Sequence, residues 1–213
     1  MQKDIDIKIC GLTSVKDISV LKKHLVRWAG FVFYPNSPRN LELEVAKKII
    51  SLVPNNIEPV AVTSDPKNEE LLLIKSVNIT TLQLHGEESP ERCQNIMDFS
   101  GLKIIKAFKI SESVDLNKVE EYTDVCDYFL FDGKPPKTAN RPGGNAVSFD
   151  WGMLAGRTFS KDYILSGGLN DKNVSLAIRT SGCKAVDVSS GVESSPGKKD
   201  LNLIRKFCIS ARN

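Results

Sequence analysis

Short apolar runs alternate with longer amphipathic runs from one end of the chain to the other. This order is typical of repeated strand–helix units in a parallel sheet rather than of hairpins. The apolar runs predict eight buried strands, near Asp6 to Cys10, Phe31 to Tyr34, Glu58 to Val62, Thr81 to Leu84, Lys103 to Phe108, Tyr128 to Phe131, Tyr163 to Ser166 and Ala185 to Val188.

The amphipathic runs begin at residues with helix-capping chemistry. Ser14 and Asp17 form the pattern of an N-terminal capping pair, for a first helix that would carry Val15, Ile18, Leu21, Leu25 and Trp28. A capping side chain before a proline suits a first helical turn, because the missing N–H of proline has no partner there in any case. Such starts are predicted at Asp65-Pro66 and Ser89-Pro90, and similar ones at Asn170-Asp171 and Lys199-Asp200.

Eight consecutive units without a long polar linker predict an α/β fold, a single-domain (β/α)8 TIM barrel over residues 1–213. An open, doubly wound sheet is the alternative, but it usually needs a reversal of strand order and gives no reason for eight units. The sixth unit fits least well. Its segment 132–144 is rich in proline and glycine, which predicts a long mobile loop before a short helix over Asp150 to Leu154.

The charge balance excludes some classes of partner. The 213 residues carry 29 basic and 26 acidic side chains, a net charge of +3, and these are spread along the chain. A nucleic-acid binder needs a concentrated basic surface, so we expect no nucleic-acid partner, whereas small anionic substrates stay compatible. No apolar run is long enough for a signal peptide or a membrane span. We therefore expect no membrane partner.

The cysteines indicate reduced thiols. Five of them are widely spaced and form no C-x-x-C pair, and no histidine stands at a metal-ligand interval. This pattern favours a cytoplasmic location and predicts no metal site. Apart from Cys10, the cysteines fall where core residues are expected, at Cys93, Cys126, Cys183 and Cys208.

Two glycine-containing segments follow the seventh and eighth predicted strands. They are Ser166-Gly167-Gly168-Leu169-Asn170 and Asp187-Val188-Ser189-Ser190-Gly191-Val192-Glu193. Glycines let backbone N–H groups approach an anion closely, and these two loops are the usual phosphate site of a TIM barrel. Each glycine could instead serve only a tight turn. Because the two loops belong to adjacent strands, the phosphate interpretation is favoured, and it implies a phosphorylated small molecule.

Cys10 and Asp132 are the candidates for proton transfer at the carboxyl ends of the first and sixth strands. A thiolate is a competent base and a protonated carboxyl group a competent acid. The alternatives are a small core residue for Cys10 and a turn residue for Asp132. Arg39 has the geometry to hold a substrate carboxylate with two hydrogen bonds, or it is a solvated residue, and His85 ends a strand as a polar contact.

Several motifs together resemble the phosphoribosylanthranilate isomerase family, the (β/α)8 enzymes of tryptophan biosynthesis, over essentially the whole chain. Besides the two glycine segments, they are Lys8-Ile9-Cys10-Gly11-Leu12-Thr13, Ser37-Pro38-Arg39, Gln83-Leu84-His85-Gly86 and Phe149-Asp150-Trp151. Each motif is weak alone, but their order and spacing together are specific.

The resemblance implies an Amadori rearrangement of N-(5-phosphoribosyl)anthranilate to the 1-deoxyribulose phosphate, without cofactor or metal. Asp132 would be the general acid at the furanose ring oxygen, Cys10 the general base at C2, and Arg39 the contact to the anthranilate carboxylate. The phosphate would lie on Gly167, Gly168, Ser190 and Gly191, with Gln83, His85 and Asp187 as polar contacts. We expect a monomer whose partner is this small-molecule substrate.

The sixth loop departs from the family pattern. The family usually has Gly-Gly-Thr-Gly or Gly-Gly-Ser-Gly before Phe-Asp-Trp, whereas this chain has Gly143-Gly144-Asn145-Ala146. Asn145 still donates a hydrogen bond and tolerates positive φ, so we expect altered affinity or loop motion rather than loss of activity.

Two other functions stay open from the sequence. A non-catalytic barrel that binds phosphorylated metabolites would have no need of an acid and a base such as Asp132 and Cys10. Indole-glycerol-phosphate synthase, a related barrel, predicts a lysine and glutamates at several strand ends and an N-terminal extension, and this sequence lacks both features.

Overall fold

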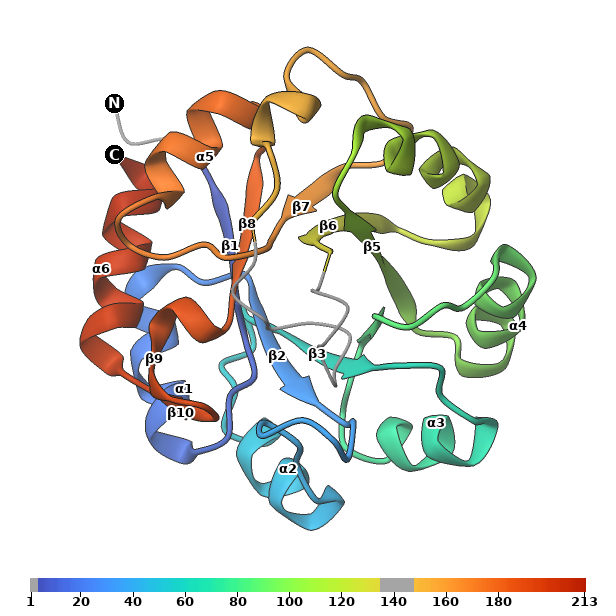
Figure 1. The fold of residues 1–213 in the computed structure, drawn as a ribbon. Coiled ribbons are helices and arrows are strands. Elements are labelled where there is room, and N and C mark those ends of the chain that lie inside the picture. Colours follow the sequence, from blue (N-terminus) through green and yellow to red (C-terminus); the bar gives the residue numbers. More distant parts are fainter. Residues whose placement is uncertain (1–3, 135–147) are drawn as a thin grey trace.

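Eight parallel strands close into a barrel in the computed structural model, which describes residues 4–134 and 148–213 (Figure 1). Each strand pairs with the next, and the last pairs with the first from Asp6↔Ala185 to Ile9↔Val188. The closed ring confirms the predicted barrel and rules out the open sheet. The strands are β1 (Asp6–Cys10), β2 (Trp28–Val32), β3 (Glu58–Thr63), β4 (Thr81–Leu84), β5 (Lys103–Ile110), β6 (Tyr128–Gly133), β7 (Tyr163–Leu165) and β8 (Ala185–Val188).

Helices surround the barrel (Figure 1). The α-helices are α1 (Val15–Leu21), α2 (Leu43–Ile50), α3 (Asn68–Lys75), α4 (Pro90–Ser100), α5 (Val174–Ser181) and α6 (Leu201–Arg212). Four 3-10 helices and a short hairpin complete the described elements, namely η1 (Lys22–His24), η2 (Ser113–Val125), η3 (Trp151–Leu154), η4 (Ser190–Val192), β9 (Glu193–Ser195) and β10 (Lys198–Lys199). Helix α6 contacts both α5 and α1, which completes the outer ring. No helix in the described ranges combines the length and the apolar character that a bilayer crossing requires.

Three of the predicted helix starts are confirmed. The Ser14 hydroxyl accepts from the N–H of Asp17, whose carboxylate accepts in return from the N–H of Ser14. Ser89 caps α4 ahead of Pro90, and the Asp200 carboxylate accepts from the first turn of α6. Side-chain caps of this kind typically stabilise a helix by about 1 kcal/mol.

Two other predicted starts are wrong. Helix α3 begins only at Asn68, because Asp65 adopts a left-handed conformation with φ 49 and its carboxylate accepts from the N–H of Glu87 on the next loop. Likewise, α5 begins at Val174 instead of following Asn170-Asp171 directly. In both places the polar side chain orders the loop rather than the helix.

The second strand and the first helix also differ from their predicted bounds. Leu25, with φ 50, turns the chain after η1, so the first helix does not reach Trp28, which is the first residue of β2. The run from Trp28 to Tyr34 is almost entirely apolar, so its sequence does not indicate where the strand begins or ends. In the fifth unit the connecting element is the 3-10 helix η2. The short helix after the sixth loop is present as η3, whereas residues 135–147 of that loop lie outside the described residues.

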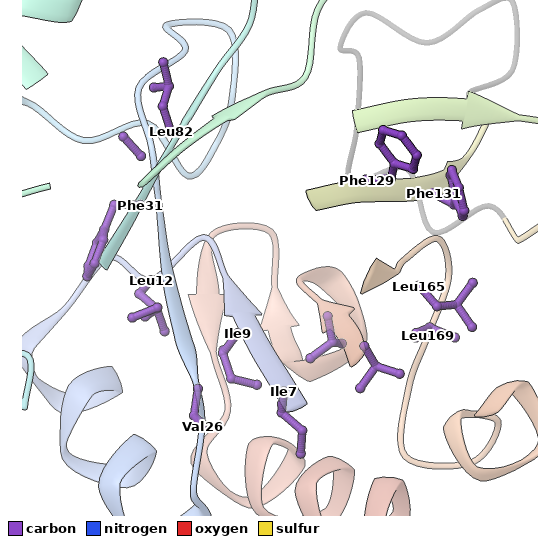
Figure 2. Packing of buried hydrophobic residues seen from close by; sticks show 14 of the residues in the cluster. Ile7, Ile9, Leu12, Val26, Phe31, Leu82, Phe129, Phe131, Leu165 and Leu169 are labelled. Carbon is purple, nitrogen blue, oxygen red and sulfur yellow. The ribbon is translucent and has the colours of Figure 1, made fainter. Parts of the chain in front are cut away.

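Two apolar cores lie on opposite sides of the strands. The larger one fills the space between the strands and the helices, and Figure 2 shows part of it around Ile7, Ile9 and Phe129. A smaller one fills the barrel interior with Trp28, Val60, Ile105, Ala107, Leu130, Ile164 and Ala185. Because side chains alternate along a strand, Lys8 and Cys10 face the interior while Ile7 and Ile9 face the helices. Cys10, as the last residue of β1, lies at the carboxyl-terminal mouth of the barrel.

Candidate active site

An open cavity lies at the carboxyl ends of the strands. The cavity brings together nearly all the predicted site residues, namely Cys10, Arg39, Gln83, His85, Asp132, Gly167, Gly168, Asp187 and Ser190. Gly191 is not among the lining residues, although it belongs to the same loop as Ser190. The predicted groups from at least six strands thus face one space.

Cys10 ends β1 and is surrounded by charge. Lys8, two residues earlier on the same face, is fully buried and its Nζ lies 3.0 Å from Oδ1 of Asp187 on β8. The Ser166 hydroxyl donates to the other oxygen of Asp187 at 3.1 Å. A Cβ added at Gly30 would lie 3.1 Å from Sγ of Cys10 and 3.2 Å from Nζ of Lys8. Glycine at that position therefore leaves room for the thiol and the ammonium group side by side.

Burial raises the pKa of the Cys10 thiol, and the Lys8 ammonium group is the strongest opposing influence. Asp187 adds to the increase, whereas Lys199 and Arg39 lower the pKa of the thiol. The pKa of Lys8 is itself raised: burial lowers it, but Asp187 and Cys10 together outweigh burial. Lys8 is therefore a cation beside a thiol whose pKa burial raises.

Asp132 lies within β6, which continues to Gly133, rather than in the loop after the strand. Its Oδ1 accepts from the N–H of Gly133 at 2.9 Å, and its Oδ2 lies 3.2 Å from Nε2 of His85. The other ring nitrogen of His85 lies 2.8 Å from the amide nitrogen of Gln83. If that amide donates, His85 carries its proton on Nε2 and donates to Asp132. Gln83 Oε1 has no hydrogen-bond partner in the part of the chain that the structure describes.

Arg39 is 4% exposed, so the alternative of a solvated residue is wrong. Its Nε and Nη2 donate to the two carboxylate oxygens of Glu193 at 2.7 and 2.8 Å. Lys199 adds a contact of 2.8 Å to the same carboxylate and donates to the backbone oxygen of Ser189. Burial raises the pKa of Glu193, but Arg39 and Lys199 outweigh it, so the net shift is downward. Burial lowers the pKa of Lys199, only partly opposed by Glu193.

The loops after β7 and β8 are in direct contact. Gly167 and Gly168 have φ of 87 and 64, a conformation that only glycine adopts at little cost. A Cβ at Gly191 would lie 1.9 Å from the backbone oxygen of Leu169, so a side chain there would force the loops apart. Helix η4 begins at Ser190, beside the cavity. Possible contacts from Gly143-Gly144-Asn145-Ala146 lie outside the described residues.

Sequence reasoning missed three groups that shape this site, Lys8, Gly30 and Lys199. Lys8 has a usable signal, because it stands two positions before Cys10 and so shares its face of the strand. Lys199 has none, because its place depends on the β9–β10 hairpin, which the sequence pattern did not predict.

Comparisons with known proteins agree with this geometry. The family model described as N-(5'phosphoribosyl)anthranilate (PRA) isomerase matches residues 7–209. An N-(5'-phosphoribosyl)anthranilate isomerase of Paramagnetospirillum magneticum is 44% identical over 98% of this chain and 97% of its own length. One of Sinorhizobium fredii is 42% identical over 98% of this chain and 93% of its own.

Solved structures are similar in fold as well. The crystal structure of phosphoribosyl anthranilate isomerase from Thermotoga maritima matches with a TM-score of 0.87 at 35% identity, covering 97% of this chain and 98% of that one. A phosphoribosyl anthranilate isomerase in complex with reduced 1-(o-carboxyphenylamino)-1-deoxyribulose 5-phosphate matches with a TM-score of 0.84 at 33% identity and the same coverage. The chain therefore belongs to the N-(5'-phosphoribosyl)anthranilate isomerase family.

Proposed function

We propose that the cavity catalyses the Amadori rearrangement of N-(5'-phosphoribosyl)anthranilate to 1-(2-carboxyphenylamino)-1-deoxyribulose 5-phosphate, a step of tryptophan biosynthesis. The observation that carries the assignment of roles is the placement of Cys10 and Asp132. They face the same cavity from β1 and β6, which are separated in the ring by β7 and β8. A bound sugar between them would meet an acid on one side and a base on the other.

Asp132 is the general acid of this proposal. Its proton goes to the furanose ring oxygen, the bond from that oxygen to C1 breaks, and the anthranilate nitrogen forms a protonated Schiff base with C1. The hydrogen bonds from Gly133 and His85 hold the carboxyl group in place. A positioned general acid typically contributes about 10²–10⁴ in rate.

Cys10 is the general base. Its thiolate removes the proton from C2, which the neighbouring Schiff base has made acidic, and the resulting enolamine tautomerises to the ketose. No atom is gained or lost overall, so the reaction needs no external oxidant or reductant. Burial raises the pKa of Cys10 overall, and the cations Lys8, Lys199 and Arg39 oppose this increase by favouring the thiolate.

The two ends of the substrate are bound by different loops. We assign the phosphate to Gly167, Gly168, Ser190 and Gly191, since two loops that meet beside a helix start present backbone N–H groups to an anion. Arg39 contacts the anthranilate carboxylate. Glu193 takes the N–H of Nε and one N–H of Nη2, so both N–H groups of Nη1 and the second N–H of Nη2 are left for that contact. Gln83, His85 and Asp187 line the cavity as polar contacts.

A cytoplasmic location and a monomeric state belong to the same proposal. All five cysteines are free and buried, which suits a reducing compartment. The large apolar side chains exposed in the described residues are distributed around the ring, from Val15 on α1 to Ile209 on α6. A dimer interface gathers such side chains on one face. Light scattering after gel filtration tests the monomer.

The decisive test forms phosphoribosylanthranilate in the cuvette from anthranilate and follows the loss of its fluorescence when the protein is added. Cys10→Ala serves as the control, because it keeps the phosphate and carboxylate contacts. Rapid loss with the wild type and not with the variant supports the isomerase. If the wild type binds a reduced product analogue but turns nothing over, the chain is a binding barrel and the proposal is wrong.

A further inference from the structure

The charged groups around Cys10 form a set that the acid–base roles alone do not explain. Lys8 is entirely buried inside the barrel, where an ammonium group is costly unless it is paired. It has a partner in Asp187, but a buried ion pair often contributes little to stability compared with apolar residues of the same size. Its position beside the thiol, across the space left by Gly30, suggests a different use.

We propose that Lys8 is a positioning residue for proton abstraction, whose fixed ammonium group holds Cys10 as the thiolate during turnover. The inference rests on the proposed function of Cys10. Lys8 does not touch the reacting carbon in this proposal. It acts through the sulfur atom, and Asp187 with Ser166 keeps its ammonium group in place.

Four charged residues from different elements act on the thiol of Cys10. They are Lys8 on β1, Asp187 on β8, Lys199 on β10 and Arg39 in the loop after β2. Tyr34, which also follows β2, packs near the thiol with Val32 and Val62. Glu193 sits behind Arg39 and Lys199 and neutralises one of them. Lys8 is the cation with the strongest effect on the thiol, and Asp187 is the anion that opposes it.

This arrangement predicts opposite effects for the two members of one ion pair. Lys8→Met removes the cation, so the thiol ionises at higher pH. Asp187→Asn removes the anion but keeps an amide oxygen for Lys8, so the thiol ionises at lower pH. A purely structural ion pair would give the same kind of damage from either side. The sign of the pH change therefore separates a role in ionisation from a role in folding.

The experiment measures the rate of iodoacetamide alkylation against pH, with Cys10→Ser as the blank for the other four cysteines. The midpoint is the pH at which the alkylation rate of Cys10 is half its maximum. We expect the midpoint for Lys8→Met to lie about one pH unit or more above that of the wild type, as is usual for the loss of one close opposite charge. We expect the midpoint for Asp187→Asn to lie below it. In Lys8→Met the acidic limb of kcat/KM should move in the same direction as the midpoint.

Two further variants keep the test decisive if Lys8→Met does not fold. Lys8→Met with Asp187→Asn leaves no unpaired charge, and its midpoint should still lie above the wild type but below that of Lys8→Met. Lys106→Met is the matched control, since Lys106 pairs with Glu88 at 2.6 Å and is also buried, but faces the helices. Its midpoint should equal that of the wild type.

Unchanged midpoints in both variants that lack Lys8, or an upward change in Asp187→Asn, would overturn the role of Lys8. Alkylation needs no substrate, so this result is independent of the isomerase assay. If the midpoints follow the expected order and phosphoribosylanthranilate is not converted, the failure lies in the proposed function instead.

Discussion

The two sides of the cavity bring a proton-transferring group to the same space by different physical means. Around Cys10, the β1–β8 side carries full charges in close contact, with Lys8 against Asp187 and Arg39 against Glu193. Around Asp132, the β4–β6 side carries a hydrogen-bonded series of a backbone N–H, an imidazole and an amide. The groups around Cys10 are mainly ions, whereas the direct partners of Asp132 are dipoles; the buried ion pair of Lys106 and Glu88 on that side is not part of the cavity lining.

This difference suits the opposite tasks of the two groups. A base must lose its proton inside an apolar barrel, which is unfavourable unless cations are near. An acid must be aligned with the atom that it protonates, and the hydrogen bonds from Gly133 and His85 hold the carboxyl group of Asp132 in place. The following predictions test that contrast from the largest expected effect to the smallest.

Removing either proton carrier should have the largest effect. Cys10→Ala and Asp132→Asn should each lower kcat by about two to four decades, the usual contribution of a positioned base or acid. The losses should not add, because without ring opening the C2 proton is not acidic and the base has nothing to remove. Stopped assays of the two single variants and the double variant measure this.

Circular dichroism of the same variants is the control for folding. If Cys10→Ala keeps nearly wild-type kcat while Asp132 is intact, another group is the base. In that case the ionic side of the cavity would serve substrate binding alone.

Arg39→Ala should have the next largest effect, on two separate measurements. Loss of a charge-assisted hydrogen bond to the substrate carboxylate costs about 1.5–3 kcal/mol, or about one to two decades in kcat/KM. The variant should also unfold at a lower temperature, because Glu193 keeps only Lys199 as a partner in a buried position. Arg27→Ala, which removes a half-exposed pair with Asp6 at the other end of the barrel, is the control.

Inhibition by inorganic phosphate shows which end of the substrate Arg39 contacts. Its inhibition constant should be the same in Arg39→Ala as in the wild type, because phosphate binds on the glycine loops. An inhibition constant that rises in parallel with the loss of kcat/KM would place Arg39 at the phosphate.

The residues of this site that could be predicted from the sequence are those at strand ends and in the glycine-containing loops. Cys10, Asp132 and His85 come at or near the ends of their strands, and in a barrel all those ends meet at one mouth. Lys8 was not predicted, because a lysine in an alternating strand normally faces solvent, whereas here the inner face of the strand is the barrel interior. The partner of Arg39 was missed because the β9–β10 hairpin is too short to leave a hydrophobic pattern. The strand bounds near Trp28 failed because an unbroken apolar run has no period.

On the dipolar side, His85→Gln should have a moderate effect. The variant removes the imidazole between Gln83 and Asp132, a loss comparable to one neutral hydrogen bond, about 0.5–1.5 kcal/mol. The expected decrease in kcat is therefore about two- to tenfold, with KM little changed. Steady-state kinetics at several pH values measure both. A decrease as large as that of Asp132→Asn would make His85 a proton carrier itself and would remove the contrast between the two sides.

The smallest expected effect is the pH dependence of stability that Glu193 confers on the ionic side. Its pKa in the folded protein lies below the ordinary value of 4.5, because Arg39 and Lys199 outweigh the effect of burial. A carboxyl group whose folded pKa is lowered contributes stability above its unfolded pKa and loses it as the pH falls through the folded value. The free energy of unfolding of the wild type should therefore exceed that of Glu193→Gln near neutral pH, and the difference should shrink as the pH falls below about 4.5. Urea unfolding of both proteins at several pH values measures this difference.

Glu87→Gln is the control, because the pKa of Glu87 is also lowered, by Lys109, but this carboxylate is largely exposed and screened by water. If the two variants show the same pH dependence, the buried ions around Arg39 contribute no more to stability than a surface pair, and their arrangement serves the ligand rather than the fold.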